Sequence, residues 1–242
     1  PTTGAGSVQS IEDLLQREGG RQPQVRGFSQ RDGWSSEPLD LSGLGRVDAD
    51  ARLFIGKLVA GDMRIGATQL LVALKASALR LTIEDALLYE GRAKGFVTLD
   101  ATRAVALGAN LQIDGVAALP LLKDGAGFEG LAGKGKLSLA VAGQGRSEKE
   151  IVETLNGKAD ITFTDGAIVG WNVPQMIRGL GQGRFSGFDR VAGEKTDFSE
   201  LAASFQIASG VATNKDLRLV SPSLRVTGAG TVELPARRLD YT

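Results

Sequence analysis

The chain has 242 residues, enough for one large domain or two small ones, each with its own core. Lys plus Arg (28) equals Asp plus Glu (28), so no net charge favours binding to nucleic acid or an acidic membrane surface. There is no Cys and no His, which excludes disulfides, thiolate nucleophiles and zinc–thiolate sites, and removes the commonest general base and metal ligand. Aromatic residues make up 5% and Gly 33 residues, which predicts short strands, tight turns and an aliphatic core.

The first 33 residues differ from the rest and are predicted to form an N-terminal helix and loop segment. Ser10 and Asp13 give a helix-start signal, and Gly19-Gly20 ends that helix. The following residues are polar and rich in turn formers, with one short strand expected at 25–28. Residues 34–242 are expected to form a separate β domain.

From Leu39 onward apolar and polar residues alternate, as in half-buried strands. The longest alternation covers residues 87–99, and its glycines leave open whether it is one bent strand or contains a turn. Residues 70–99 and 201–234 follow the same order of strand, Ala-Ser and strand, which indicates duplication of a β-meander. A Gly-rich loop at 179–193 lies between these repeats.

Three short helices are predicted inside this β-rich region, two of them before residue 155. One covers 117–124 and is expected to be broken by Pro120. The other begins at Ser147, whose spacing from Glu150 is that of a capping box.

The stretch from 155 to 177 combines a strand, a turn, a second strand and a helix start in few residues. It starts with an alternating strand, and Asp165-Gly166 then predicts a hairpin turn. A second strand at 167–171 and a helix starting at Pro174 are expected to follow.

The motifs that resemble catalytic or cofactor sites have simpler explanations. Gly125 to Gly130 spells a dinucleotide fingerprint, but it precedes a strand instead of a helix, so we predict a loop. Asp48 and Asp50 share one strand face and are expected to be solvated, and Glu84-Asp85 is a poor acid–base pair. We therefore predict no catalytic residue, no metal site and no cofactor, and a chain that is not an enzyme.

The apolar strand faces leave two fold interpretations. In a closed β-sandwich, two sheets bury these faces against each other, and each inward side chain contributes about 1.5–3 kcal/mol. In a long curved sheet, the inner face stays open as a trough for lipid tails, whose burial contributes about 0.8 kcal/mol per methylene. Periodicity alone favours the sandwich.

The order of several short motifs resembles the C-terminal region of the AsmA family of Gram-negative envelope proteins. The resemblance covers most of residues 34–242. The motifs are Trp34 to Leu44 leading to Asp48 to Ala51, Leu119-Pro120-Leu121-Leu122, Leu131 to Gly135, Leu155 to Ala159, Asp165 to Ile168, and Gly228 to Tyr241.

The resemblance implies a periplasmic domain in outer-membrane biogenesis, tethered to the inner membrane by an N-terminal anchor outside this sequence and continuing beyond its C-terminal end. It also implies relatedness to bridge-like proteins that conduct phospholipid along a hydrophobic groove, and supplies no catalytic residues. From the resemblance and the alternation together, we expect a mainly β fold with a few short helices. Its strongly curved antiparallel or mixed sheet is expected to consist of repeated meanders and to form a groove or half-barrel.

The expected function is a non-enzymatic module that holds or conducts phospholipid. The alternative is a structural or assembly scaffold with a closed core, which binds envelope proteins through the loops around 179–193. The residues predicted to face lipid are Ile161, Phe163, Phe205, Ile207, Leu217, Leu219, Val226 and Val232.

Overall fold

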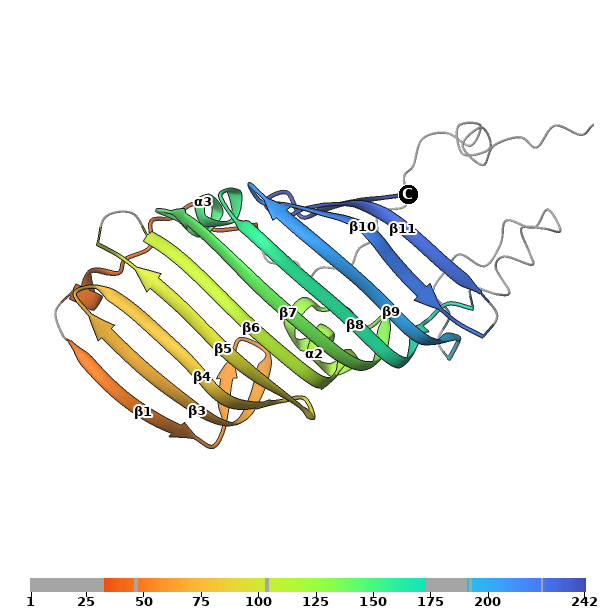
Figure 1. Cartoon of the computed structure of the whole chain (residues 1–242), viewed down its shortest axis with the longest axis horizontal. Helices are drawn as coiled ribbons and strands as arrows, with labels where there is room; N and C mark the ends of the chain where they lie inside the picture. The colour runs from red at the N-terminus through yellow and green to blue at the C-terminus, as the bar shows by residue number, and fades with distance from the viewer. Residues whose placement is uncertain (1–32, 46–47, 103–104, 173–190, 192, 223) are drawn as a thin grey trace, which may run out of the picture.

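The computed structural model describes residues 33–45, 48–102, 105–172, 191, 193–222 and 224–242. Strands dominate this part of the chain (Figure 1). Its elements are η1 (Ser42–Gly45), β1 (Ala49–Ile55), β2 (Leu58–Ala60), β3 (Met63–Lys75), β4 (Ala78–Leu88), β5 (Gly91–Asp100), β6 (Val105–Ala117), α2 (Ala118–Ala126), β7 (Leu131–Gly145), α3 (Glu148–Glu153), β8 (Asn156–Val169), β9 (Lys195–Ala208), β10 (Val211–Val220), β11 (Arg225–Glu233) and β12 (Arg238–Tyr241).

The strands form one 12-stranded sheet in which every pair is antiparallel. The order is β1-β3-β4-β5-β6-β7-β8-β9-β10-β11-β12, and β2 pairs only with β3. Among the described residues β1 and β12 are the two edges, so the sheet is not closed into a barrel. The predicted open, mainly β fold is confirmed. The sandwich is wrong, because all these strands belong to one sheet and none forms a second sheet to cover its face.

Two-residue turns join several neighbouring strands. Ala76-Ser77, Tyr89-Glu90 and Ser209-Gly210 each combine two positive φ angles, as in the hairpin turns that match the twist of paired strands. The alternation over 87–99 is therefore two strands, β4 and β5, which meet at Tyr89-Glu90.

The hairpin predicted at Asp165-Gly166 is wrong. β8 continues without interruption to Val169 and pairs with β9 on both sides of this dipeptide. Asp165 does have a positive φ of 48°. The conformation is absorbed as an irregularity in the β7–β8 register, which shifts between Ala132 and Lys134. A turn signal inside a long strand thus produces a bulge when the neighbouring strands continue past it.

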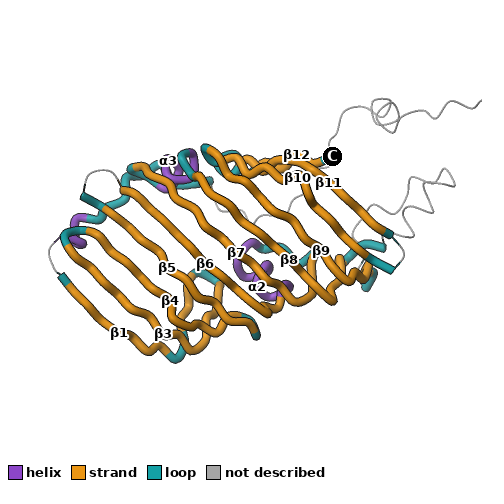
Figure 2. The backbone as a smooth tube through the Cα atoms, in the orientation of Figure 1, coloured by secondary structure: helices purple, strands orange, loops and turns teal. Residues whose placement is uncertain are grey.

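The two α-helices of the described residues lie where the sequence predicts them (Figure 2). Pro120 occupies the first turn of α2, where its missing N–H has no partner to lose, so the helix is not broken there. Ser147 caps α3 by accepting a hydrogen bond from the Glu150 N–H at 3.3 Å. The helices predicted at Ser10 and Pro174, the strand at 25–28 and most of the loop at 179–193 lie outside the described residues.

Residues 33–45, called here the strap, run along one rim of the sheet. The Trp34 Nε1–H donates to the Leu234 carbonyl at 2.8 Å, and the Arg237 guanidinium lies 4.9 Å from the centre of the Trp34 ring. Further along, the Leu39 N–H donates to the Arg146 carbonyl at 2.8 Å. The strap therefore connects the end of β11 with the turn before α3, and continues toward β1.

Candidate functional site: the apolar face of the sheet

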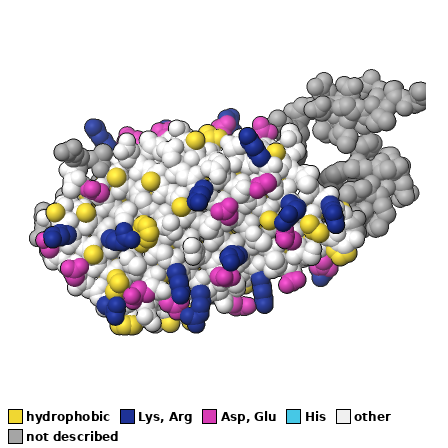
Figure 3. Space-filling model, viewed as in Figure 1, with side chains coloured by type: hydrophobic (Ala, Val, Ile, Leu, Met, Phe, Trp, Pro, Cys, Tyr) yellow, Lys and Arg dark blue, Asp and Glu magenta, His cyan; other side chains and the backbone are white. Residues whose placement is uncertain are grey.

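Alternation along each strand gives the sheet one apolar and one polar face. On the apolar face, one row of paired residues crosses all eleven strands of the sheet path and contains only aliphatic residues and glycine. From β1 to β12 this row reads Ala51, Val72, Leu81, Val97, Ala109, Val141, Gly157, Ile207, Ala212, Val232 and Leu239. The opposite face carries the charged side chains, which Figure 3 shows scattered across the strands.

The neighbouring row is also mostly apolar, and its two side chains with polar groups are an Asn and a Tyr. It reads Leu53, Leu70, Ile83, Gly95, Leu111, Leu139, Ala159, Phe205, Asn214, Gly230 and Tyr241. Asn214 is only 1% exposed, and all its polar atoms are hydrogen-bonded. Neither row contains a charged side chain.

Helix α2 covers one end of the apolar face, behind the strands in the view of Figure 1. Ala118 of α2 belongs to the same buried cluster as Phe163 of β8 and Leu219 of β10, which are 3% and 6% exposed. Burying a side chain of the size of Phe163 or Leu219 contributes about 1.5–3 kcal/mol. Gly135 makes room for Phe163, because a Cβ there would lie 2.8 Å from the ring. This end is a closed core.

Three polar residues fasten α2 to the strands beneath it. The Tyr89 hydroxyl donates to Asp124 Oδ2 at 2.6 Å, and Arg64 lies 3.3 Å from the same oxygen. The hydrogen bond from Tyr89, assisted by Arg64, lowers the pKa of Asp124. Burial raises the pKa of Tyr89, and the bond to Asp124 raises it further. These contacts connect the C-terminal part of α2 with the β4–β5 turn and the start of β3.

The other end of the face, near α3, is hollow. A cavity of about 300 Å³ lies there, and all its lining residues are apolar. They are Leu139, Val141, Leu155, Ala159, Phe205, Ile207, Ala212, Val232 and Leu234. These residues come from β7, β8, β9, β10, β11 and the segments that flank them. Because no second sheet faces this region in the described chain, the hollow is a place where an apolar ligand could pack.

All eight residues predicted to face lipid lie on strands β8 to β11, and the register places them on the apolar face. Phe163 and Leu219 are buried under α2, with Ile161 packed against their cluster. Phe205, Ile207 and Val232 line the hollow. Leu217 is half-buried, and Val226 is 41% exposed near the β12 edge. The structure thus divides the set into covered and uncovered groups. Their contact with lipid remains a prediction.

Several residues of the hollow were not singled out from the sequence. Leu139 and Val141 alternate visibly along β7, and Leu155 belongs to the apolar stripe after α3, so periodicity could have found them.

Strand β10 contains a β-bulge between Asn214 and Leu217, which the sequence signals more weakly than it signals alternation. There, Asp216 accepts hydrogen bonds from the Ser204 N–H and hydroxyl, which lower its pKa, while Asn214 accepts from the Leu217 N–H. The extra residue shifts the phase of the strand and returns Leu217 and Leu219 to the apolar face.

Three of the four acidic residues considered from the sequence have side-chain roles in the structure, and Asp50 lies on the exposed β1 edge strand. Asp48 accepts from the Ala76 N–H at 3.0 Å, Glu84 pairs with Arg52, and Asp85 pairs with Arg92. Gly125 and Ala126 form the end of α2 and Gly127 caps it, so the fingerprint-like motif ends a helix instead of opening one, and only its part from Gly127 on is the predicted loop. Among the described residues, no three His, Cys, Asp or Glu side chains lie close enough together to bind a metal ion.

The sequence model of the AsmA family matches residues 26–217, which contain most of the apolar face. The chain belongs to the AsmA family. Membership in the AsmA family supports a general role in biogenesis of the outer membrane and cell envelope. The family is generally non-enzymatic and is typically associated with the envelope. Comparison with curated proteins and with solved structures gave no match. No helix in the described ranges has the length and hydropathy needed to cross a membrane.

Proposed function

We propose that this AsmA-family chain is a periplasmic module that holds or conducts phospholipid along the apolar face of its sheet. The observation that carries the proposal is the row from Ala51 to Leu239, which crosses the sheet without a polar side chain. A face of this kind is costly to expose to water unless something covers it. Acyl chains are a suitable cover, because each methylene removed from water contributes about 0.8 kcal/mol.

The dimensions of the face suit several acyl chains side by side. Eleven strands at about 4.8 Å spacing give a row roughly 48 Å long. One leaflet of a bilayer has a hydrocarbon thickness of only about 15 Å, half of the ~30 Å core. The two central rows have no charged group to bind a phosphate, so the headgroup would lie outside the face, in water. This arrangement favours recognition of tails over recognition of headgroups.

The location is part of the proposal. Envelope association of the family, together with the resemblance described above, supports a periplasmic position with an inner-membrane anchor outside the described residues. In that position a tail-binding face would shield phospholipid from the aqueous space between the two membranes. The module needs no catalytic residue, cofactor or metal for this role.

The second candidate function is an assembly scaffold for envelope proteins. The observation that favours it is the closed core under α2, where Phe163 and Leu219 are already covered by the chain itself. If the rest of the face is also covered by protein in the cell, the domain would serve as a rigid platform, and lipid would have no access. The loop around 179–193, which we proposed as a partner site, falls mostly outside the described residues.

A matched pair of neighbouring substitutions separates the two functions. Phe205 lines the hollow, and Gln206 is exposed on the opposite face of the same strand. We expect Phe205→Asp to leave the domain folded but to remove phospholipid that co-purifies from native membranes, as measured by mass spectrometry. Gln206→Asp should retain wild-type lipid levels. Unfolding of Phe205→Asp alone would favour the scaffold with a closed core, because a buried unpaired charge is strongly destabilising. Absence of lipid from the wild type would count against the transport function.

A further inference from the structure

The large apolar side chains that the described structure exposes lie mostly at the two edges of the sheet. Near one edge these are Leu53, Phe54 and Val59, exposed by 42%, 70% and 60%, and Leu87 on the neighbouring part of β4 is 40% exposed. β1 has seven residues, and all but the last are exposed. An edge strand of this length presents unpaired backbone N–H and C=O groups beside apolar side chains, which makes it a template for another strand.

Nothing in the described part of the chain covers the β1 edge. The strap reaches β1 from the far end of the sheet, since Trp34 is bound at Leu234 beyond β11. Within the described residues this edge is open to pairing with a strand of another molecule.

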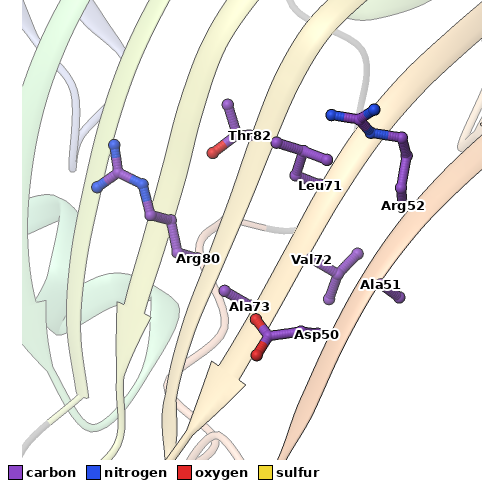
Figure 4. Close-up of a pocket in the computed structure, with 8 residues that line it drawn as sticks. All are labelled: Asp50, Ala51, Arg52, Leu71, Val72, Ala73, Arg80 and Thr82. Atoms are coloured by element: carbon purple, nitrogen blue, oxygen red, sulfur yellow. The ribbon is translucent and has the colours of Figure 1, made fainter.

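The charges on β1 are arranged so that the strand complements itself. Asp50 and Arg52 lie on the polar face, two residues apart, and Ala51 between them lies on the apolar face (Figure 4). Arg52 also pairs with Glu84 at 3.4 Å, and its side chain is 58% exposed, so its guanidinium is accessible to a further carboxylate.

We propose that β1 pairs antiparallel with β1 of a second copy of this chain, about a two-fold axis at Ala51. In this register Asp50 of each copy lies opposite Arg52 of the other, so the interface contains two opposite-charge pairs. On the apolar face Ala49 lies opposite Leu53, and Ala51 lies opposite its own copy. The interaction goes beyond the proposed function and does not depend on lipid binding.

The neighbouring registers are less favourable. A two-fold axis at Asp50 or Arg52 places like charges directly opposite each other. A shift by one residue would put apolar residues of one copy on the polar face of the other. Rotation about an axis normal to the sheet keeps both apolar faces on the same side, so the row that starts at Ala51 continues into the second copy.

Charge substitution tests the register in the 242-residue chain, by sedimentation equilibrium over a concentration series. The wild type should dimerise. Arg52→Asp and Asp50→Arg should each weaken the dimer by roughly tenfold or more, because each replaces two attractive pairs with two repulsive ones. The double variant should recover the dimer, and an equimolar mixture of the two single variants should form a heterodimer. Asp240→Arg, on the β12 edge, is the matched control and should have no effect.

Cysteine substitution gives a second readout, which reports the register directly. Because the chain has no Cys, Ala51→Cys introduces a single thiol at the two-fold axis, where paired Cα atoms lie about 4.5–5.5 Å apart and can form a disulfide. Mild oxidation should link Ala51→Cys into a covalent dimer and leave Leu239→Cys monomeric. A wild type that stays monomeric at every concentration, a mixture that forms no heterodimer, or equal cross-linking of both cysteine variants would overturn the proposal.

Discussion

The hydroxyl of Tyr89, in the β4–β5 turn, donates a 2.6 Å hydrogen bond to Asp124 near the end of α2. Arg64 at the start of β3 lies 3.3 Å from the same carboxylate oxygen. Three segments that are distant in sequence thus meet at one carboxylate, and this contact holds α2 over the closed end of the apolar face. The structural consequence is that stability should respond to the charge of Asp124.

Acid should weaken this contact. Tyr89 and Arg64 lower the pKa of Asp124 in the folded chain. The ionised carboxylate therefore makes its full contribution to folding stability above the unfolded pKa of about 4. It should disappear as pH falls from that value through the lower folded pKa. We expect Asp124→Asn to be less stable than wild type at neutral pH, with a difference that shrinks below about pH 4. Urea unfolding across this pH range measures it. Asp114→Asn, at an exposed carboxylate, is the control, and an equal effect there would contradict the assignment.

The two ends of the apolar face should respond differently to a buried charge. Phe163 is 3% exposed under α2, so we expect Phe163→Asp to destabilise the domain by about 4 kcal/mol or more, enough to unfold it. Phe205→Asp, in the hollow, should cost clearly less. Chemical denaturation followed by circular dichroism compares the two variants. Equal destabilisation would show that the hollow is as tightly covered as the α2 end.

Close packing around Gly135 gives a second test of the closed end. A Cβ at this position would lie 2.8 Å from the Phe163 ring and 2.9 Å from Val116 Cγ1. Gly135→Ala should therefore destabilise the domain by about 1–3 kcal/mol. Gly56→Ala serves as the control, because a Cβ there meets nothing within 4 Å. A thermal melt that shows both variants equal to wild type would contradict the described packing.

The bulge in β10 should depend on one side chain. Asn214 donates to the Ser204 carbonyl at 2.8 Å and to Asp216 at 2.7 Å, and accepts from the Leu217 N–H. Asn214→Ala leaves these groups without partners and should cost about 1–3 kcal/mol. Thr213→Ala, one residue earlier on the opposite face, should be nearly neutral. Loss of stability in both variants to the same extent would show that the strand, and not the amide, is responsible.

Much of this architecture follows from residue alternation. Period 2 predicts Leu217, Leu219, Val226 and Val232 on one face, because it fixes the side of each residue once a strand is assumed. Alternation does not say what faces that side, since a sandwich and an open sheet have the same pattern. For the same reason, the sequence did not show that α2 covers Phe163 and leaves Phe205 beside a hollow.

Local turn signals were less informative than alternation. Asp165-Gly166 has the composition of a hairpin, yet the long strands on both sides keep β8 extended and the dipeptide becomes an irregularity. At Tyr89-Glu90 the opposite occurs, because a turn forms at two residues that rarely adopt positive φ. In both places the pairing of the neighbouring strands decides the conformation, and that information is not local.

Photo-cross-linking at alternate positions tests the central claim, that lipid tails pack on the apolar face, most directly. A photoreactive residue would replace Phe205 or Val232 on the apolar face, and Gln206 or Thr231 on the opposite face of the same strands. After irradiation in native envelopes, we predict phospholipid adducts at 205 and 232 and none at 206 and 231. Adducts at all four positions alike, or at none, would contradict it.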